Sequence, residues 1–113
     1  MKKSIKNELF LLGTKGGPAI RPKGSMPSSS LLVLDNEKII IDAGLGVTKS
    51  LTDIGFNLNE LSNIFITHLH SDHYLELGPL IHTAWTTGLT KKIKIYGPKG
   101  LVDYWQKFLL SMQ

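Results

Sequence analysis

Three of the four histidines in this 113-residue sequence lie within six consecutive positions, and an aspartate lies among them. The segment is "THLHSDH", which contains His68, His70, Asp72 and His73 and follows an apolar run at residues 64–66. Imidazole nitrogens bind borderline divalent metals well, and a carboxylate can bind a metal or orient a water molecule. Alternate side chains of an extended segment point to the same side, so His68 and His70 can bind one ion. A turn could direct Asp72 and His73 toward a second ion, as in two-metal hydrolytic sites.

The crowding of these side chains favours a metal site over three unrelated surface or core histidines. The sequence contains no cysteine, so the ligands must be nitrogen and oxygen atoms. A bound metal lowers the pKa of its water to about 7, which makes a side-chain nucleophile unnecessary. His82 stands alone in "LIHTAW", and we interpret it as a packing or hydrogen-bonding residue.

The elements that must position this cluster follow from the apolar pattern. Strands are predicted at residues 8–13, 31–34, 39–41, 64–67 and 93–96, with the second and third forming a hairpin around "DNEK". Helices are predicted at residues 47–54 and 74–87, the latter interrupted at Gly78 and Pro79, and from Pro98 to the end. Strands and helices therefore alternate after the hairpin, which predicts an α/β (α+β) fold with a mixed sheet and helices on one face.

The composition, with 42% hydrophobic and 19% charged residues, is that of a globular protein. The net charge of +4 is concentrated in two groups, Lys2, Lys3, Lys6, Lys15, Arg21 and Lys23, and Lys91, Lys92, Lys94 and Lys99. Each group could be solvated surface or an electropositive rim for a polyanion such as RNA. No stretch has the length of a membrane span, and the apolar patch at residues 9–12 is too short for a signal peptide. We therefore expect a cytoplasmic protein without a membrane partner.

The segment "THLHSDH" matches the H-x-H-x-D-H signature of metallo-β-lactamase-fold hydrolases. Around it, "LLGTKGGP", "KIIIDAG" and "IFITHLHSDHYLELGPL" resemble the ribonuclease Z-like and arylsulfatase-like branch of that family, over roughly residues 11–97. The resemblance implies a binuclear zinc hydrolase, with Mn²⁺ or Fe²⁺ as alternative metals. His68 and His70 would bind one ion, and Asp72 and His73 the other. Asp72 would also be catalytic, by orienting the attacking water and assisting proton transfer, while Asp42 would support the metal loop through hydrogen bonds.

The resemblance covers only part of a complete domain. The family fold is a four-layer αββα sandwich of two halves, and this chain resembles the N-terminal half. Beyond Gly97 the sequence has no histidine, and its only acid there is Asp103. We therefore expect residues 1–113 to be a single N-terminal portion of such a domain, a truncated product whose site is incomplete alone. An unpartnered apolar stripe predicts a homo-oligomer or association through an exposed half-interface; its residues are Leu101, Trp105, Phe108 and Leu109.

The function favoured by the resemblance is a ribonuclease Z-like phosphodiesterase that acts on RNA, such as precursor tRNA in tRNA processing. An arylsulfatase-like or esterase-like hydrolase of small esters is the first alternative. The second alternative, from a different class, is a non-catalytic remnant that binds metal or a partner.

Overall fold

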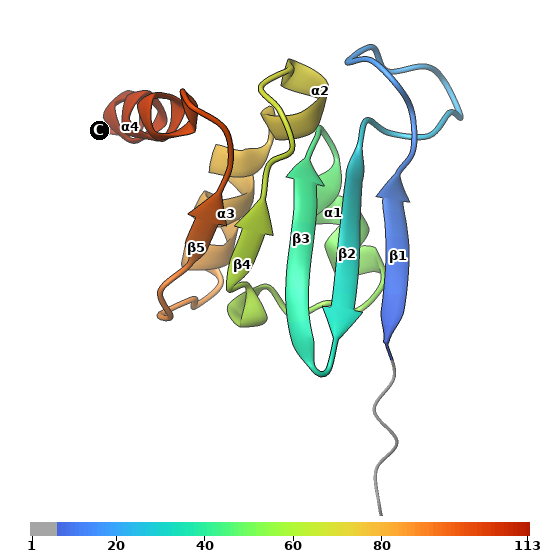
Figure 1. The fold of residues 1–113 in the computed structure, drawn as a ribbon, viewed down its shortest axis with the longest axis horizontal. Coiled ribbons are helices and arrows are strands. Elements are labelled where there is room, and N and C mark those ends of the chain that lie inside the picture. Colours follow the sequence, from blue (N-terminus) through green and yellow to red (C-terminus); the bar gives the residue numbers. More distant parts are fainter. Residues whose placement is uncertain (1–6) are drawn as a thin grey trace, which may run out of the picture.

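The computed structural model describes residues 7–113, which form one mixed five-stranded sheet in the order β1-β2-β3-β4-β5 (Figure 1). The first three strands are antiparallel neighbours, and β3, β4 and β5 are parallel. Their bounds are Glu8–Gly13 for β1, Ser29–Leu34 for β2, Glu37–Ala43 for β3, Asn63–Phe65 for β4 and Lys94–Tyr96 for β5. All five predicted strands are confirmed. The charged group at Lys2, Lys3 and Lys6 lies outside the described residues.

The predicted hairpin joins β2 and β3 through a two-residue turn. Asp35 and Asn36 both have positive φ, 49° and 69°. Positive φ at both central residues is the geometry of a type I′ turn, which matches the twist of antiparallel strands. Asp and Asn tolerate this conformation better than most residues do, so the turn fixes the register of the hairpin.

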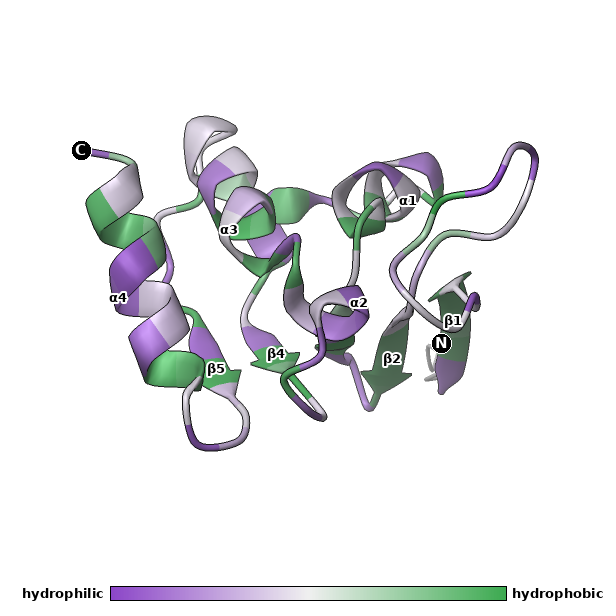
Figure 2. Ribbon diagram, turned by 90° about the horizontal axis from the view of Figure 1, so that it is seen from above, coloured by the Kyte–Doolittle hydropathy of each residue, from purple (hydrophilic) through white to green (hydrophobic). Residues whose placement is uncertain are grey.

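Helices cover one face of the sheet (Figure 2). Helix α1 (Val47–Asp53) and helix α3 (Leu77–Thr86) lie on that face, and helix α4 (Leu101–Ser111) flanks β5. A short 3-10 helix, η1 (Leu58–Glu60), precedes β4. The core between sheet and helices contains fully buried side chains from both, including Ile40, Leu51, Ile64, Leu77 and Leu80. This arrangement is the predicted mixed sheet with helices on one face.

The predicted helix at residues 74–87 begins later than expected. The chain forms a four-residue helix, α2 (Ser71–Tyr74), then bends at Leu75 and Glu76 before α3 begins. The expected interruption at Gly78 and Pro79 was therefore misplaced. Pro79 lies in the first turn of α3, where the missing N–H has no helical partner to lose. No helix within residues 7–113 is long and apolar enough to cross a membrane.

The face of the sheet opposite α1 and α3 is open and apolar. Leu9 and Leu11 of β1 are 58% and 65% exposed, and the rings of Phe65 and Tyr96 stack with centroids 4.5 Å apart. The strand register aligns Leu11, Ser30, Ile41, Phe65 and Tyr96 in one row across the strands, and Ser30 is the polar member of that row. Isolated exposed apolar residues are ordinary, whereas several of them on one face mark a surface suited to packing against another element.

Helix α4 is held against α3 at Gly78. A Cβ atom at Gly78 would lie 2.5 Å from two ring carbons of Phe108, and the Tyr104 hydroxyl accepts a hydrogen bond from Gly78 N at 3.2 Å. Tyr104 also meets Tyr74 edge-on, with ring centroids 5.0 Å apart. The docking of α4 therefore depends on the absence of a side chain at residue 78.

We predict that Gly78→Ala lowers the free energy of unfolding by about 1–3 kcal/mol, the range for overpacking a filled site. An alanine in a helix is otherwise favourable by up to about 1 kcal/mol, so a loss isolates the clash with Phe108. Chemical denaturation measures the effect. Gly16→Ala is the control, because a Cβ there meets nothing within 4 Å. A Gly78→Ala protein as stable as Gly16→Ala would contradict the observed packing.

Burial raises the pKa of Tyr104, and the nearby Tyr74 adds to the rise, while the hydrogen bond from Gly78 opposes it. The folded state thus favours the neutral phenol. The contribution of Tyr104 to the free energy of unfolding is complete below the ordinary tyrosine pKa of about 10. It is lost as the pH rises through the higher pKa that Tyr104 has in the folded state. We predict that Tyr104→Phe flattens the fall of stability above about pH 10, measured by denaturation across that range. An unchanged alkaline slope would exclude this role.

Candidate metal centre

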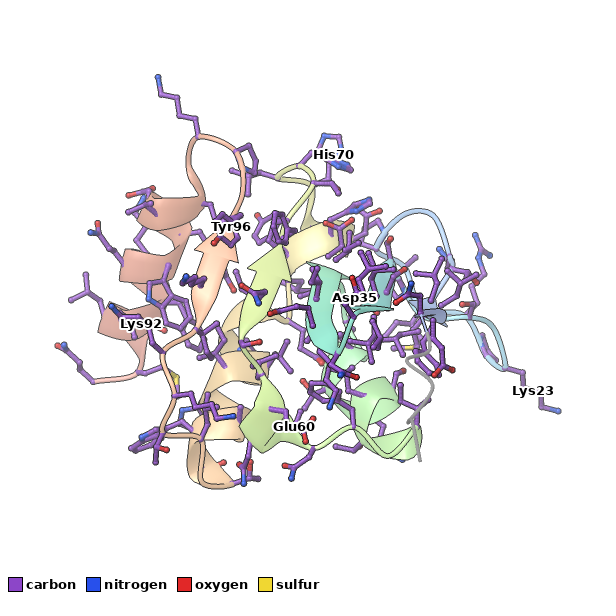
Figure 3. The ribbon with its side chains drawn as sticks, turned by 60° about the horizontal axis from the view of Figure 1, so that its bottom comes forward. Lys23, Asp35, Glu60, His70, Lys92 and Tyr96 are labelled. Atoms are coloured by element: carbon purple, nitrogen blue, oxygen red, sulfur yellow. The ribbon has the colours of Figure 1, made fainter. Side chains whose placement is uncertain are left out.

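The clustered histidines lie at the edge of the sheet where β3 and β4 end. His68 and His70 occupy the loop after β4, and Asp72 and His73 lie on α2. Figure 3 shows His70 projecting from this edge. The His68 ring centroid lies 4.7 Å from that of His70 and 3.9 Å from that of His73. The structure therefore brings the three predicted imidazoles into one group.

Asp42 at the end of β3 is the anchor of this group. Its side chain is almost fully buried, and Oδ1 accepts a hydrogen bond from Thr67 N at 2.7 Å. Oδ2 accepts from the Thr67 hydroxyl at 2.8 Å and lies 2.7 Å from His73 Nδ1. Its backbone has a φ of 63°, in the left-handed region that Asp tolerates better than most residues. Asp42 thus binds the loop after β4 and helix α2 to the same strand end.

These hydrogen bonds define which imidazole nitrogens carry protons. A carboxylate accepts hydrogen bonds, so Nδ1 of His73 is the donor to Asp42. The Thr67 hydroxyl has one hydrogen, directed at Asp42, and must accept from His68 Nδ1 at 3.1 Å. In neutral rings, Nε2 of both His68 and His73 then carries a free lone pair. This is the tautomer that outer-shell carboxylates impose on metal-binding histidines.

The Asp72 carboxylate faces one of these lone pairs. Its Oδ2 lies 3.3 Å from His73 Nε2 and accepts a hydrogen bond from Gly17 N at 3.1 Å. Two acceptors at this separation repel each other unless a cation lies near both or the ring gains a second proton. The Gly17 contact also brings the glycine-rich loop after β1 to the edge of the site.

The donor set fits a divalent metal in its chemistry, since it consists of imidazoles and a carboxylate with oriented lone pairs. Within residues 7–113, however, no group of three or more His, Cys, Asp or Glu side chains already has the arrangement needed to hold an ion. The cluster thus offers metal-binding atoms but does not form a complete coordination site within residues 7–113. The roles of His68, His70, Asp72, His73 and Asp42 toward a metal remain predictions.

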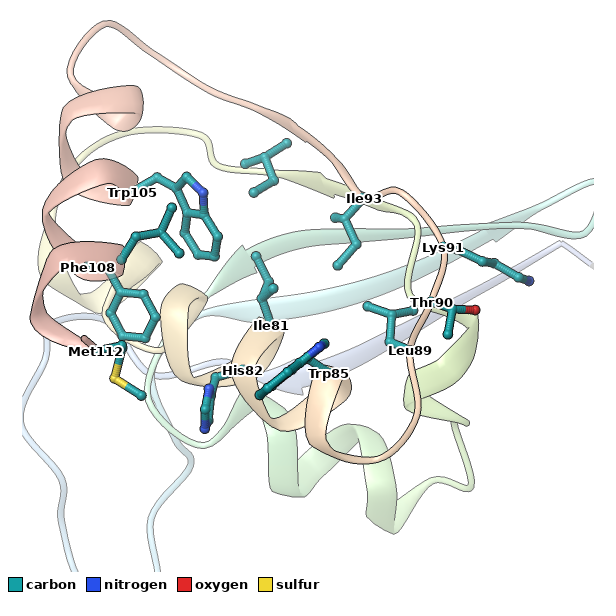
Figure 4. Close-up of a pocket in the computed structure, with 12 residues that line it drawn as sticks. Ile81, His82, Trp85, Leu89, Thr90, Lys91, Ile93, Trp105, Phe108 and Met112 are labelled. Carbon is teal, nitrogen blue, oxygen red and sulfur yellow. The ribbon is translucent and has the colours of Figure 1, made fainter.

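Two glycines allow the loops of the site to approach closely. A Cβ at Gly44 would lie 2.4 Å from the Asp72 carbonyl oxygen, and one at Gly100 would lie 2.8 Å from the side chain of Leu69. Leu69 separates His68 from His70, so the start of α4 braces the loop that carries them. His82 is elsewhere, on α3 beside Trp85, in an apolar groove between α3 and α4 (Figure 4).

Sequence reasoning did not identify Thr67, Gly17 or Glu76 as parts of this region. Thr67 directly precedes the motif, and a hydroxyl at that position is a local signal that could have been noticed. The hydrogen bonds of Gly17 and Glu76 join segments far apart in the sequence, to Asp72 and to the start of α1. No local pattern reveals such partners.

The fold and the cluster place this chain among metallo-β-lactamase-fold proteins. It is similar to the crystal structure of human tRNase Z, short form (ELAC1), with 34% identity and a TM-score of 0.79, over 93% of this chain and 40% of that one. It also matches the metallo-β-lactamase fold protein YhfI from Bacillus subtilis, with a TM-score of 0.72 at 24% identity, over 88% of this chain and 39% of that one. The second likeness concerns the fold alone.

Comparison of the sequence with protein families identifies the family of this chain. Residues 7–112 match the profile of the anti-Pycsar protein Apyc1 family, and the chain belongs to that family. Curated relatives include Ribonuclease Z of Clostridium botulinum (strain Alaska E43 / Type E3), 37% identical over 96 residues, which cover 85% of this chain and 30% of the relative. Ribonuclease Z of Pyrococcus furiosus is 34% identical over 104 residues, 92% of this chain and 33% of the relative. The chain therefore spans about a third of the length of these relatives.

We predict that Asp42→Asn lowers the free energy of unfolding by about 1–3 kcal/mol, because the new amide group must face a donor from Thr67 or His73. Asn tolerates the same positive φ, so the change isolates the hydrogen bonds. Asp103→Asn on the surface of α4 is the matched control, since its exposed pair with Lys107 should contribute under about 1 kcal/mol. Equal losses in the two variants would contradict the anchoring role of Asp42.

Proposed function

We propose that this chain supplies part of a two-metal phosphodiesterase site that acts on RNA. The observation that carries the proposal is the convergence of His68, His73 and Asp72, with two Nε2 lone pairs oriented by Asp42. Relatives named Ribonuclease Z support the assignment to RNA. His68 and His70 would hold one ion and Asp72 and His73 the other, with zinc favoured by nitrogen and oxygen donors and Mn²⁺ or Fe²⁺ as alternatives.

Bound divalent cations lower the pKa of water and neutralise charge that develops on phosphoryl oxygens. The residues of the chain have separate tasks around that chemistry. Asp42 keeps His73 in one tautomer and one orientation directly, and it acts on His68 through the Thr67 hydroxyl. Gly17 N–H holds the Asp72 carboxylate in place, and Asp72 would orient the attacking water and accept its proton.

The substrate assignment rests on charge near the site. The glycine-rich loop that reaches Asp72 also carries the exposed Arg21 and Lys23, and Figure 3 shows Lys23 extending from the side of the molecule. The exposed Lys99 precedes Gly100, where a Cβ would lie 2.8 Å from the side chain of Leu69 in the histidine loop. Positively charged residues therefore belong to two segments that approach the cluster, as expected for a site that binds a polyanion.

The remaining metal ligands would come from a second sheet packed on the open apolar face. Residues 1–113 would then be the N-terminal portion of an αββα domain, with the other half of the sandwich covering Leu9, Leu11, Phe65 and Tyr96. The relatives have about three times the length of this chain, which is consistent with that assembly.

The test uses protein purified from its native host, together with any polypeptide that copurifies with it. We predict metal-dependent cleavage of an RNA phosphodiester, lost on chelation and restored by zinc or manganese. Asp72→Ala should lower turnover more than about 100-fold, since loss of even an outer-shell partner can reach that size. His82→Ala is the control and should retain activity. Near-normal rates for Asp72→Ala would contradict the mechanism.

The dependence of binding on salt concentration distinguishes an RNA substrate from a small ester. Binding of single-stranded RNA should weaken with a slope of about −0.7 per neutralised phosphate in a plot of log affinity against log salt. Turnover of an aryl ester or aryl sulfate with no RNA cleavage would favour a small-molecule hydrolase. A stable assembly without hydrolysis under any metal would favour a non-catalytic role.

A further inference from the structure

The side chain of Glu76 joins the turn after β3 to the segment that follows α2. Its Oε1 accepts a hydrogen bond from Gly46 N and its Oε2 accepts one from Thr48 N, each at 2.8 Å. Gly46 is the N-cap of α1 and has no side chain to satisfy the free amides of the first turn. Glu76 therefore caps α1 from a distant part of the chain, with a negative charge at the end where a helix favours one.

The backbone of Glu76 is fixed at the same place. Its N–H donates to the carbonyl oxygen of Ala43 at 2.9 Å, directly after the anchor residue Asp42. Glu76 thus holds β3 by its backbone and α1 by its side chain. Two bonds to a carboxylate are charge-assisted and stronger than neutral ones.

Helix α2 needs stabilising contacts from neighbouring segments because it is only four residues long. A helix of this length has no stability of its own and keeps its position only through contacts with the rest of the fold. One contact is the His73–Asp42 hydrogen bond near its end, and Glu76 lies three residues further along the chain. The position of His73 therefore depends on both.

We propose that Glu76 is a positioning residue that keeps His73 Nδ1 on Asp42 and directs His73 Nε2 toward Asp72. That this orientation of His73 serves metal binding rests on the proposed function. The orientation of His73 by Glu76 does not depend on it. Glutamine cannot replace Glu76, because its amide group would face one of the two backbone N–H groups. Aspartate is one methylene shorter and cannot span from Ala43 to both amides.

The first measurement is ¹⁵N-histidine NMR of the metal-free protein, which reports the tautomer of His73 and its Nδ1–H signal. In the unaltered chain we expect a protected Nδ1–H from the bond to Asp42. In Glu76→Gln we expect this signal to exchange rapidly with water and the tautomers to mix. The second measurement is zinc affinity by competition with a chelating dye, which we expect to fall 10–100-fold, as for other outer-shell changes.

Three variants separate positioning from general destabilisation. Asp53→Asn removes one negative charge from the exposed last turn of α1 and should leave both readouts unchanged. Val47→Ala removes buried contacts from α1 and should lower thermal stability without changing the His73 signal. Thr48→Pro deletes one donor to Glu76 in the first turn of α1, where the lost N–H makes no hydrogen bond within the helix, so it should reproduce a weaker form of the effect even if Glu76→Gln does not fold.

An unchanged His73 signal in Glu76→Gln or Thr48→Pro would overturn the inference, and so would an equal loss in Val47→Ala. Failure of the proposed function has a different signature. In that case the unaltered protein would show the His73–Asp42 signal but would bind no zinc, and the NMR comparison would still decide the role of Glu76.

Discussion

The rest of the site depends on one buried carboxylate. Asp42 ends β3 in a left-handed conformation and accepts hydrogen bonds from Thr67 and His73, which lie on two different segments. Burying a carboxylate is costly unless its oxygens are well satisfied. The loop after β4 and helix α2 must therefore remain at the end of β3. That constraint also determines the imidazole nitrogens that face outward.

Three acidic side chains stabilise this edge of the sheet through hydrogen bonds to different segments. Asp42 joins β3 to the histidine segment, Asp72 receives the glycine-rich loop through Gly17, and Glu76 caps α1. Each links segments that are distant in sequence but adjacent at the ends of parallel strands. Short elements such as α2 thereby acquire a fixed position that their own hydrogen bonds could not provide. Among residues 7–113, no helix covers the opposite face of the sheet, and its exposed apolar side chains suit packing against another element.

The sequence predicted the strands and the first and last helices because their apolar periodicity is a local property. It also predicted the hairpin, whose Asp and Asn suit a turn of positive φ. The break before α3 was misplaced, because Pro79 is acceptable in a first turn and the true bend at Leu75 and Glu76 is set by contacts with Ala43 and Gly46. The grouping of the histidines followed from their spacing. The family resemblance implied that Asp42 supports the histidine loop through hydrogen bonds, whereas the long-range contacts of Gly17 and Glu76 had no local sequence signal.

The central claim is that this anchored cluster binds a metal through its imidazoles. The most direct test is zinc K-edge X-ray absorption of the 113-residue chain loaded with less than one equivalent of zinc. We predict a first shell with nitrogen at about 2.0–2.1 Å and the multiple-scattering pattern of more than one imidazole, and we expect both to be lost when His68 and His73 are replaced by alanine. A shell of oxygen atoms alone, or a spectrum unchanged by those replacements, would contradict it.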